Sequence, residues 1–579
     1  MNLQVLDTTL IAVYFTISFS IAILLSKRSG KNTEEFFLSG RKLSWWIAGT
    51  TMVATTFAAD TPLAVTELVA KNGIAGNWLW WNFVAGNMLT VFFFARLWRR
   101  ANILTDVEFI EMRYSGKPAA FLRGFKAIYL GIFLNVIIMA WVNLALKDIL
   151  GVIFNVPESK IFLFIVGAMI IVGVYSALSG LRGIAYTDIF QFVIAMTGCI
   201  ILAVVVLEQP QVGGIDGLLQ KLPDHMFSFF PKVGLTIENA AQGVMALTFS
   251  AFIAYIGIQW WSSWYPGAEP GGGGYIAQRM MSAKNERHSL LATLWFTIAH
   301  YAIRPWPWII VALCSVILFP GLTNPREGFI LAMKNYLPTG LLGLLIAAFL
   351  AAYMSTISTH LNWGSSYIIN DLYKRFMHKE ADEKHFVAVS RITAFILVIL
   401  SALLTTVITS ISGAWEFLIN CGAGLGLVLI LRWYWWRVNA WSEITAMIVP
   451  VIAYSINFIW LEIPSPQSLF FIVPVTTVAW LLVTILTKPT EEPILQKFYE
   501  TIKPPGPGWN SFRRKYSLPK PDESLRSTAI NWFIGTTLAY VILFGIGKII
   551  FKEYILGFLL LGGSIVLFLI LNRRLKNIQ

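Results

Sequence analysis

The segment AAYMSTISTHLNWGSS, residues 351–366, carries many hydroxyl side chains within one of the most apolar stretches of the chain. A single Ser or Thr in a membrane helix can bond the carbonyl one turn earlier, so one hydroxyl alone indicates little. Here the hydroxyls form a stripe, because residues three and four positions apart share one face of a helix. That face holds Ala352, Ser355, Thr356 and Thr359, with Ser358 beside it. Such a stripe of oxygen atoms either packs against another helix or lines a site for a hard cation.

Composition identifies the class of protein. Of the 579 residues, 56% are hydrophobic and 13% are charged, whereas about a quarter of the residues in a soluble domain are charged. Apolar runs of about 20 residues, each long enough to span a bilayer as a helix, recur along the chain. The sequence therefore predicts an all-α polytopic membrane protein with about 15 transmembrane helices.

The net charge of +13 does not indicate a nucleic-acid partner. Lys and Arg concentrate in every second connecting segment, which is the pattern of topology signals. This pattern places the N-terminus outside and the C-terminus in the cytoplasm, in the cell (inner or plasma) membrane. The cysteines Cys199, Cys314 and Cys421 are isolated in apolar runs, so we expect neither a disulfide framework nor a cysteine metal site. No polar stretch is long enough to form a soluble enzyme domain.

The second polar spot is TTFAADTPLAV, residues 55–65, in an expected span at 44–70. Asp60 is a carboxylate in mid-span, and such a residue is a candidate functional group. Pro62 removes a helix hydrogen bond and frees carbonyls about one turn earlier, near Ala58. Broken transporter helices bind cations with carbonyls of this kind. The alternative is a simple kink, with Asp60 bonded to a neighbour.

Two further charges stand inside apolar surroundings. Asp188 follows the small residues of YSALSGLRGIAYTDIFQ, 175–191, and is either a cation ligand or a charge favoured by the helix dipole. Arg304, in HYAIRPWPW at 300–308, must meet an anion, carbonyls or water. Its planar fork suits a substrate carboxylate. The alternative is a structural ion pair with Asp60 or Glu67, which are themselves candidate substrate ligands.

Several uncharged residues complete the candidate substrate site. Trp260 and Trp261, beside Gln259 in a Gly-rich neighbourhood, either line a pocket or belong to an interfacial aromatic belt. Asn143 either lines a cavity or bonds between helices.

Three motifs resemble those of the sodium:solute symporter family. AAYMSTIST followed by INDLYK resembles its late core-helix motif. YSALSGLRGIAYTDIFQ resembles its motif around a Thr-Asp pair, with Ser179 in place of the first glycine, and QRMMSAKN, 278–285, resembles a cytoplasmic segment. The resemblance covers roughly residues 5–487. Arg304 with the double proline RPWPW, and Glu67, depart from the family pattern.

The resemblance implies a leucine-transporter-like core of two inverted five-helix repeats. It implies that sodium is the coupling ion, bound by backbone oxygens of Ala58, Thr61 and Ala352 and by hydroxyls of Ser355 and Thr356. Some family members hold a second sodium. The corresponding residues here are Asp188, Ser355, Ser358 and Thr359.

The resulting organisation has six parts. An extra helix and cytoplasmic loop occupy 1–43, the first repeat 44–207 and the second repeat 208–433. Two additional helices follow at 434–487. A polar cytoplasmic linker occupies 488–528, where EEPILQKFYETIK could instead lie on the membrane surface as an amphipathic helix. Two C-terminal helices and a basic tail, 529–579, form an appendage. Within the second repeat, the segment between spans 238–262 and 289–319 is expected to be a cytoplasmic connection.

The function expected from the sequence is sodium-coupled import of a small organic solute, a carboxylate or an amino acid, by alternating access. The partners are sodium, the solute and membrane lipid, and a monomer is sufficient for transport. A sugar symporter, a membrane sensor of the same fold and a channel are the alternatives, and a proton could replace sodium because Asp60 and Asp188 titrate.

Overall fold

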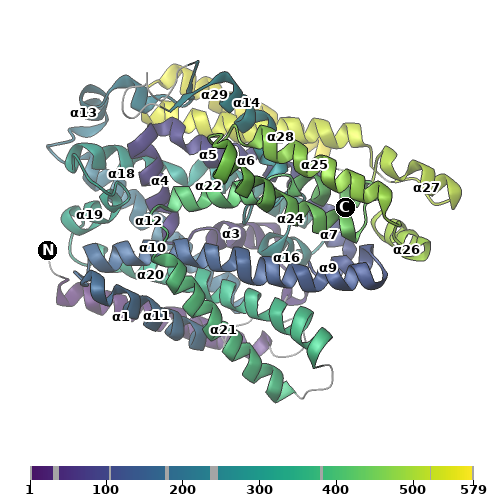
Figure 1. The fold of residues 1–579 in the computed structure, drawn as a ribbon. Helices are drawn as coiled ribbons and strands as arrows, with labels where there is room; N and C mark the ends of the chain where they lie inside the picture. The colour runs from purple at the N-terminus through teal and green to yellow at the C-terminus, as the bar shows by residue number, and fades with distance from the viewer. Residues whose placement is uncertain are drawn as a thin grey trace.

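The computed structural model describes residues 3–29, 38–103, 106–176, 181–234, 245–378, 383–521 and 523–576. Helices run side by side across the molecule (Figure 1). Among the described residues the only strands are β1 (Lys232–Val233) and β2 (Ala246–Leu247), which pair in parallel. The all-helical class predicted from the sequence is confirmed.

The helices fall into three consecutive sets. The first set is α1 (Val5–Ser29), α3 (Trp45–Thr55), α4 (Asp60–Asn72), α5 (Trp78–Trp81), α6 (Phe83–Leu89), α7 (Ala95–Ala101), α8 (Glu108–Arg113), α9 (Gly116–Ile128), α10 (Asn135–Val152), α11 (Glu158–Ser176) and α12 (Leu181–Leu207). The second set is α13 (Gly214–Lys221), α14 (Phe249–Ile253), α15 (Trp260–Ser262), α16 (Gly274–Ser282), α17 (Glu286–Ile298), α18 (Pro305–Leu318), α19 (Glu327–Tyr336), α20 (Leu341–Ser366), α21 (Glu383–Thr405), α22 (Ile411–Cys421) and α23 (Leu425–Tyr434). The third set is α24 (Ala440–Ile456), α25 (Leu469–Leu486), α26 (Glu492–Ile502), α27 (Asn510–Lys515), α28 (Leu525–Ile550) and α29 (Tyr554–Leu575).

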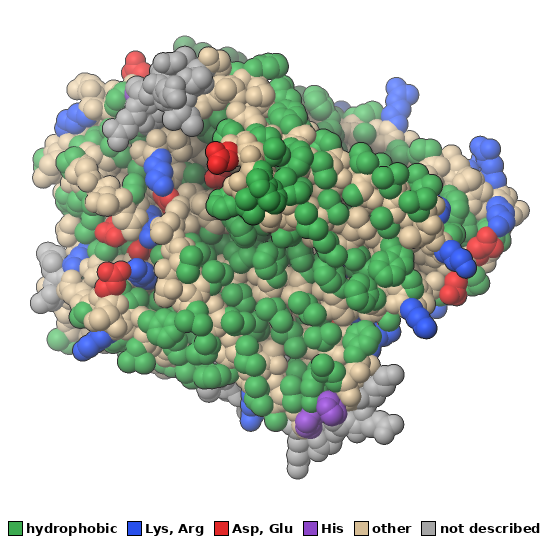
Figure 2. All heavy atoms as spheres, viewed as in Figure 1, with side chains coloured by type: hydrophobic (Ala, Val, Ile, Leu, Met, Phe, Trp, Pro, Cys, Tyr) green, Lys and Arg blue, Asp and Glu red, His purple; other side chains and the backbone are tan. Residues whose placement is uncertain are grey.

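Ten helical runs in the described part of the chain are long and apolar enough to cross a membrane, or eleven if α22 and α23, which meet at 51°, form one span. The expected span 44–70 does not meet this criterion, because α3 and α4 are short. The described part of 238–262 does not meet it either, since its helical run from α14 to α15 is short. Hydrophobic side chains cover the middle of the face in Figure 2, and charged side chains gather toward its two ends. That distribution suits a lipid environment.

The break expected near Ala58 is present. Helix α3 ends at Thr55 and α4 begins at Asp60, which leaves residues 56–59 without regular helix. Pro62 is the third residue of α4, where its missing N–H leaves no helical hydrogen bond unmade. A tight turn at the start of α4 is closed by a hydrogen bond from the Thr61 N–H to the Ala58 carbonyl (3.2 Å).

A second break was not expected. Residues 263–273 join α15 to α16 as an irregular, buried segment in which Glu269 is only 5% exposed. The sequence predicts a cytoplasmic connection for this segment. It is instead tied into the core, because the N–H of Trp264 donates to the carbonyl of Gly422 (3.1 Å). A Cβ at Gly426 would lie 2.0 Å from the Trp261 carbonyl, so glycine is required there for the close approach.

The polar segment expected as a plain linker is folded against the core. Helix α26 buries Leu495, Phe498 and Ile502, and the Trp509 indole N–H donates to the Trp433 carbonyl (2.8 Å). The amphipathic helix predicted as the alternative is therefore present, and its apolar face packs on protein.

Helix α28 is also more than an appendage. The indole N–H of Trp532 donates to the Ala85 carbonyl (2.9 Å), and the Tyr540 hydroxyl donates to the Trp81 carbonyl (3.0 Å). These bonds satisfy carbonyls on the interrupted run α5–α6, so α28 supports that part of the core.

Candidate functional site

A cavity of about 90 Å³ lies where the two breaks meet the middle of α20. The α3–α4 break contributes Thr56, Ala58, Asp60 and Thr61, and α20 contributes Thr356, Thr359 and His360. Aromatic side chains form much of the remaining wall: Trp80, Phe83, Trp141, Tyr265, Tyr275, Tyr301 and Trp415. The lining therefore combines oxygen-bearing groups with aromatic rings.

The expected first sodium site falls partly on this cavity. Ala58, Thr61 and Thr356 line it together. The Thr356 hydroxyl donates to the Ala352 carbonyl (3.0 Å), which is another expected ligand. The Ser355 hydroxyl turns instead toward Asp188. Carbonyl and hydroxyl oxygens of a broken helix and a facing helix suit a hard monovalent cation.

The expected second sodium site centres on Asp188, which is 5% exposed. Its carboxylate accepts hydrogen bonds from Ser355 (3.1 Å) and Thr55 (3.3 Å). Ser358 is linked to this group, because its hydroxyl donates to the Ser355 carbonyl (3.1 Å), whereas Thr359 lines the central cavity. Thr55 was not predicted, and it joins the cluster because α3 ends there.

Arg279 lies beside the Asp188 cluster. Its guanidinium donates to the Thr55 hydroxyl (3.2 Å), and its charge acts on the Asp188 carboxylate. A cation that entered this cluster would therefore either displace the Arg279 guanidinium or weaken its interaction with the cluster.

Asp60 and Arg304 both line the central cavity and are buried, with 3% and 2% exposure. Arg304 forms no ion pair with Asp60 or Glu67 in the described part of the chain. Its guanidinium donates to the Val53 carbonyl (3.0 Å) and to the Thr56 hydroxyl (3.1 Å). Arg304 thus holds the end of α3 through a carbonyl that the break leaves free.

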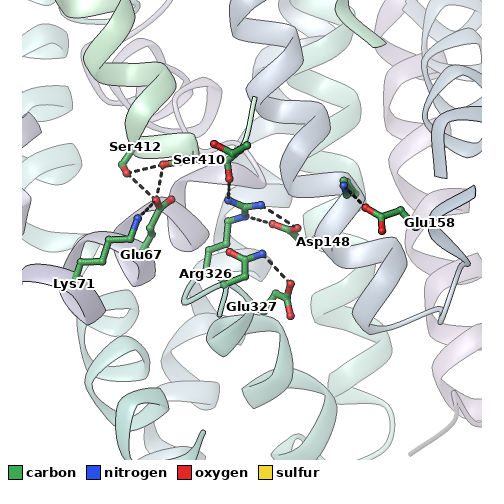
Figure 3. A network of polar contacts seen from close by, with 11 residues as sticks. Glu67, Lys71, Asp148, Glu158, Arg326, Glu327, Ser410 and Ser412 are labelled. Carbon is green, nitrogen blue, oxygen red and sulfur yellow. Dashed lines mark hydrogen bonds and ion pairs between the residues drawn. The ribbon is translucent and has the colours of Figure 1, made fainter. Parts of the chain in front are cut away.

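Glu67 lies in a different place. Its carboxylate accepts hydrogen bonds from Lys71 (2.7 Å), Ser410 (2.5 Å) and Ser412 (2.9 Å). Figure 3 shows these side chains converging between α4 and the start of α22. Glu67 therefore holds the turn before α22 and does not line the cavity.

The remaining expected substrate residues also lie outside the cavity lining. Asn143 accepts from the Tyr353 hydroxyl (2.8 Å), and Gln259 donates to the Leu79 carbonyl (2.9 Å). Trp260 stacks on Trp532 at 5.5 Å, and the Trp261 indole donates to the carbonyl one turn earlier (2.7 Å). Asn143, Gln259 and Trp260 therefore connect different helices, whereas Trp261 bonds within its own helical run.

Several cavity residues are not indicated by the sequence patterns. His300 lies within the HYAIRPWPW motif but is not among the predicted site residues. Its Nδ1 is 3.0 Å from the Thr56 hydroxyl. Tyr265 lies within the unexpected second break, and Tyr275 follows it in α16. The glycine and proline residues around them were the available signal.

Comparisons with known proteins agree with this geometry. A sequence profile described as the sodium:solute symporter family matches residues 36–450. A sodium/glucose cotransporter of Vibrio parahaemolyticus is 23% identical over 81% of this chain and 88% of its own length. A sodium/myo-inositol cotransporter 2 of Oryctolagus cuniculus is 23% identical over 84% of this chain and 77% of its own length.

Among solved structures, a sodium-coupled sialic acid symporter in a substrate-bound outward-open state superposes with a TM-score of 0.65. The match is 18% identical and covers 84% of this chain and 99% of that one. The leucine-transporter-like fold expected from the sequence is thereby confirmed. The chain is a multi-pass membrane transporter and belongs to the sodium:solute symporter family.

Proposed function

We propose that this sodium-coupled symporter imports a small organic carboxylate or amino acid through the central cavity. Sodium binds at Ala58, Thr61, Ala352, Ser355 and Thr356, where it bridges the α3–α4 break to α20. A second ion binds at Asp188 with Ser355, Ser358 and Thr359. The N-terminus faces the outside, and the C-terminus faces the cytoplasm.

The observation that carries this proposal is the meeting of two broken helices and a hydroxyl-rich helix at one buried cavity. An ion at the α3–α4 break would hold α3, α4 and α20 in one arrangement. Coupling follows if the ion binds the solute-competent arrangement more tightly than the alternative arrangement. Each sodium that enters with the membrane potential supplies about 2.3 kcal/mol per 100 mV.

Arg304 supports a carboxylate on the solute, because it brings a buried positive charge to the cavity wall. A sugar is the second candidate. It is favoured by the glucose and myo-inositol cotransporters that the chain resembles.

A solute screen tests the proposal. The melting temperature of the purified chain is measured against a library of carboxylates, amino acids and sugars, in sodium and in potassium. A ligand that binds the native state raises the apparent stability. We expect a carboxylate or an amino acid to raise the melting temperature in sodium only. A response to sugars alone would replace the proposed solute, and equal responses in potassium would overturn sodium coupling.

A further inference from the structure

We infer that the solute is a zwitterion, with its cationic nitrogen at Asp60 inside an aromatic box and its carboxylate toward Arg304. This inference rests on the proposed function, since it names the solute of the same cavity. It separates an amino-acid-like compound from a simple carboxylate and from a sugar.

Asp60 brings an unpaired acceptor to the cavity lining. It is the first residue of α4 and is 3% exposed. The Trp141 side chain lines the cavity with it. One carboxylate oxygen, Oδ1, has no hydrogen-bond partner in the described part of the chain. A buried carboxylate oxygen without a partner is costly, and a donor that carries positive charge would satisfy it best.

The aromatic side chains that line the cavity with this carboxylate favour a cationic group on the solute. Phe83 stacks on Tyr265 with 5.5 Å between ring centroids, and Tyr265 meets Trp415 edge to face at 5.9 Å. Trp80 stacks on Tyr301 at 5.4 Å on another part of the cavity lining. Ring faces attract ammonium groups, and the attraction grows when the site is desolvated.

Arg304 supplies the opposite charge. One of its terminal nitrogens is occupied by the Val53 carbonyl and Thr56, and the other lies 3.4 Å from His300 Nε2. Its Nε has no partner in the described residues. Asp60 and Arg304 are the charged members of the cavity lining, so the cavity is electrically neutral apart from any bound ion.

This charge balance argues against the two other classes of solute. A monocarboxylate would pair with Arg304 but would bring no positively charged donor to the unpaired Asp60 oxygen. A sugar could bond the Thr, Tyr and His side chains of the lining, but it would pair neither of the two charges. A zwitterion matches both charges at once.

The test uses the purified full chain with sodium and three matched sets of compounds. The sets are neutral α-amino acids with N-methylated analogues, the same carboxylic acids without nitrogen, and the same amines without a carboxylate. We expect at least one zwitterion to raise the melting temperature at concentrations where its two halves do not. Equal stabilisation by the nitrogen-free acid, or stabilisation by sugars only, would overturn the inference.

Variants locate the cationic group. Asp60→Asn should raise the zwitterion concentration needed for a half-maximal shift by about tenfold or more, because a charge-assisted hydrogen bond is lost. Its sodium response should persist, and loss of that response would instead assign Asp60 to the ion.

Tyr265→Leu should weaken zwitterion binding by about three- to tenfold, and Tyr265→Phe should not. Equal effects of both Tyr265 variants would contradict the aromatic box.

The response to sodium distinguishes a failure of this inference from a failure of the proposed function. A sodium response with no preference for zwitterions means that this inference fails and the proposed coupling stands. No sodium response in the unmodified protein means that the proposed function itself fails.

Discussion

The backbone N–H of Gly424 donates to the carbonyl of Ser262 at 2.8 Å, which joins the α22–α23 break to the end of α15. The nearby bond from Trp264 to Gly422 strengthens the same junction. Two segments about 160 residues apart in sequence therefore share backbone hydrogen bonds beside the cavity. A substitution at either break should therefore also disturb the packing of the other break.

Gly424→Ala should destabilise this junction. Gly424 has φ of 95°, and a Cβ there would lie 2.6 Å from the Thr476 side chain. The strain of a positive φ and the overpacking each cost about 1–3 kcal/mol. We expect an apparent melting temperature several degrees lower, measured in detergent. The control is Gly167→Ala, since a Cβ at Gly167 would meet no atom within 4 Å. Equal melting temperatures for the two variants would contradict this account of the junction.

Asp148→Asn should also destabilise the protein strongly. Asp148 on α10 forms a buried ion pair with Arg326 (Figure 3), which also donates to the Thr409 carbonyl (2.6 Å). Removing one partner leaves a buried charge uncompensated, at a cost of about 3–5 kcal/mol. The nearby exposed pair of Lys147 and Glu158 provides the control. Glu158→Gln should leave the melting temperature unchanged, and a similar drop in both variants would show that burial is not the cause.

Glu67→Ala should loosen α22. The change removes the acceptor for Ser410 and Ser412, which precede or begin that helix. We expect the backbone amides of 411–421 to exchange hydrogen several-fold faster, measured by mass spectrometry, because local opening becomes easier. Lys71→Ala is the matched control, since it removes a half-exposed partner of Glu67 and leaves both serine contacts. Unchanged exchange in Glu67→Ala would show that the carboxylate does not hold this turn.

Trp532→Phe and Tyr540→Phe test whether α28 supports the core. Each variant removes one hydrogen bond to the α5–α6 run and keeps a ring for stacking on Trp260 or Trp78. The lost bond and the unsatisfied carbonyl should cost about 1 kcal/mol or more in each case. Phe533→Leu, at a position 65% exposed, should have no effect on the melting temperature. Equal melting temperatures for all three variants would show that α28 is an appendage that does not support the core.

The first break could be predicted from the sequence because its cause is local. Pro62 cannot donate to a helix, and a carboxylate beside it marks a polar position in mid-span. The oxygen stripe on α20 could be predicted for the same reason, because helical spacing alone places Ser355, Thr356 and Thr359 near one another.

The second break could not be predicted in this way. The glycine and proline residues of 263–273 have the same local meaning in a solvent-exposed loop and in a buried segment. Burial depends on partners remote in sequence, such as Gly422 and Gly426, whose missing side chains permit the close approach. The cavity residues Tyr265 and Tyr275 were missed with it.

The partners of Arg304 and Glu67 also could not be predicted from the local sequence. The Val53 carbonyl is free to accept from Arg304 only because α3 ends two residues later. Glu67 meets Ser410 across more than 300 residues of chain. A charge in an apolar run indicates that a partner exists, but the fold determines which partner it is.

The most direct test of the central claim is a sodium titration of the apparent melting temperature at constant ionic strength, with potassium as the replacement ion. Sodium should raise the melting temperature of the unmodified chain in a saturable manner. Ser355→Ala and Thr356→Ala should require several-fold more sodium for the same shift, whereas Ser401→Ala, at a buried hydroxyl on α21, should behave as the unmodified chain does. No sodium response, or identical titrations in all four proteins, would contradict sodium binding at the α3–α4 break and α20.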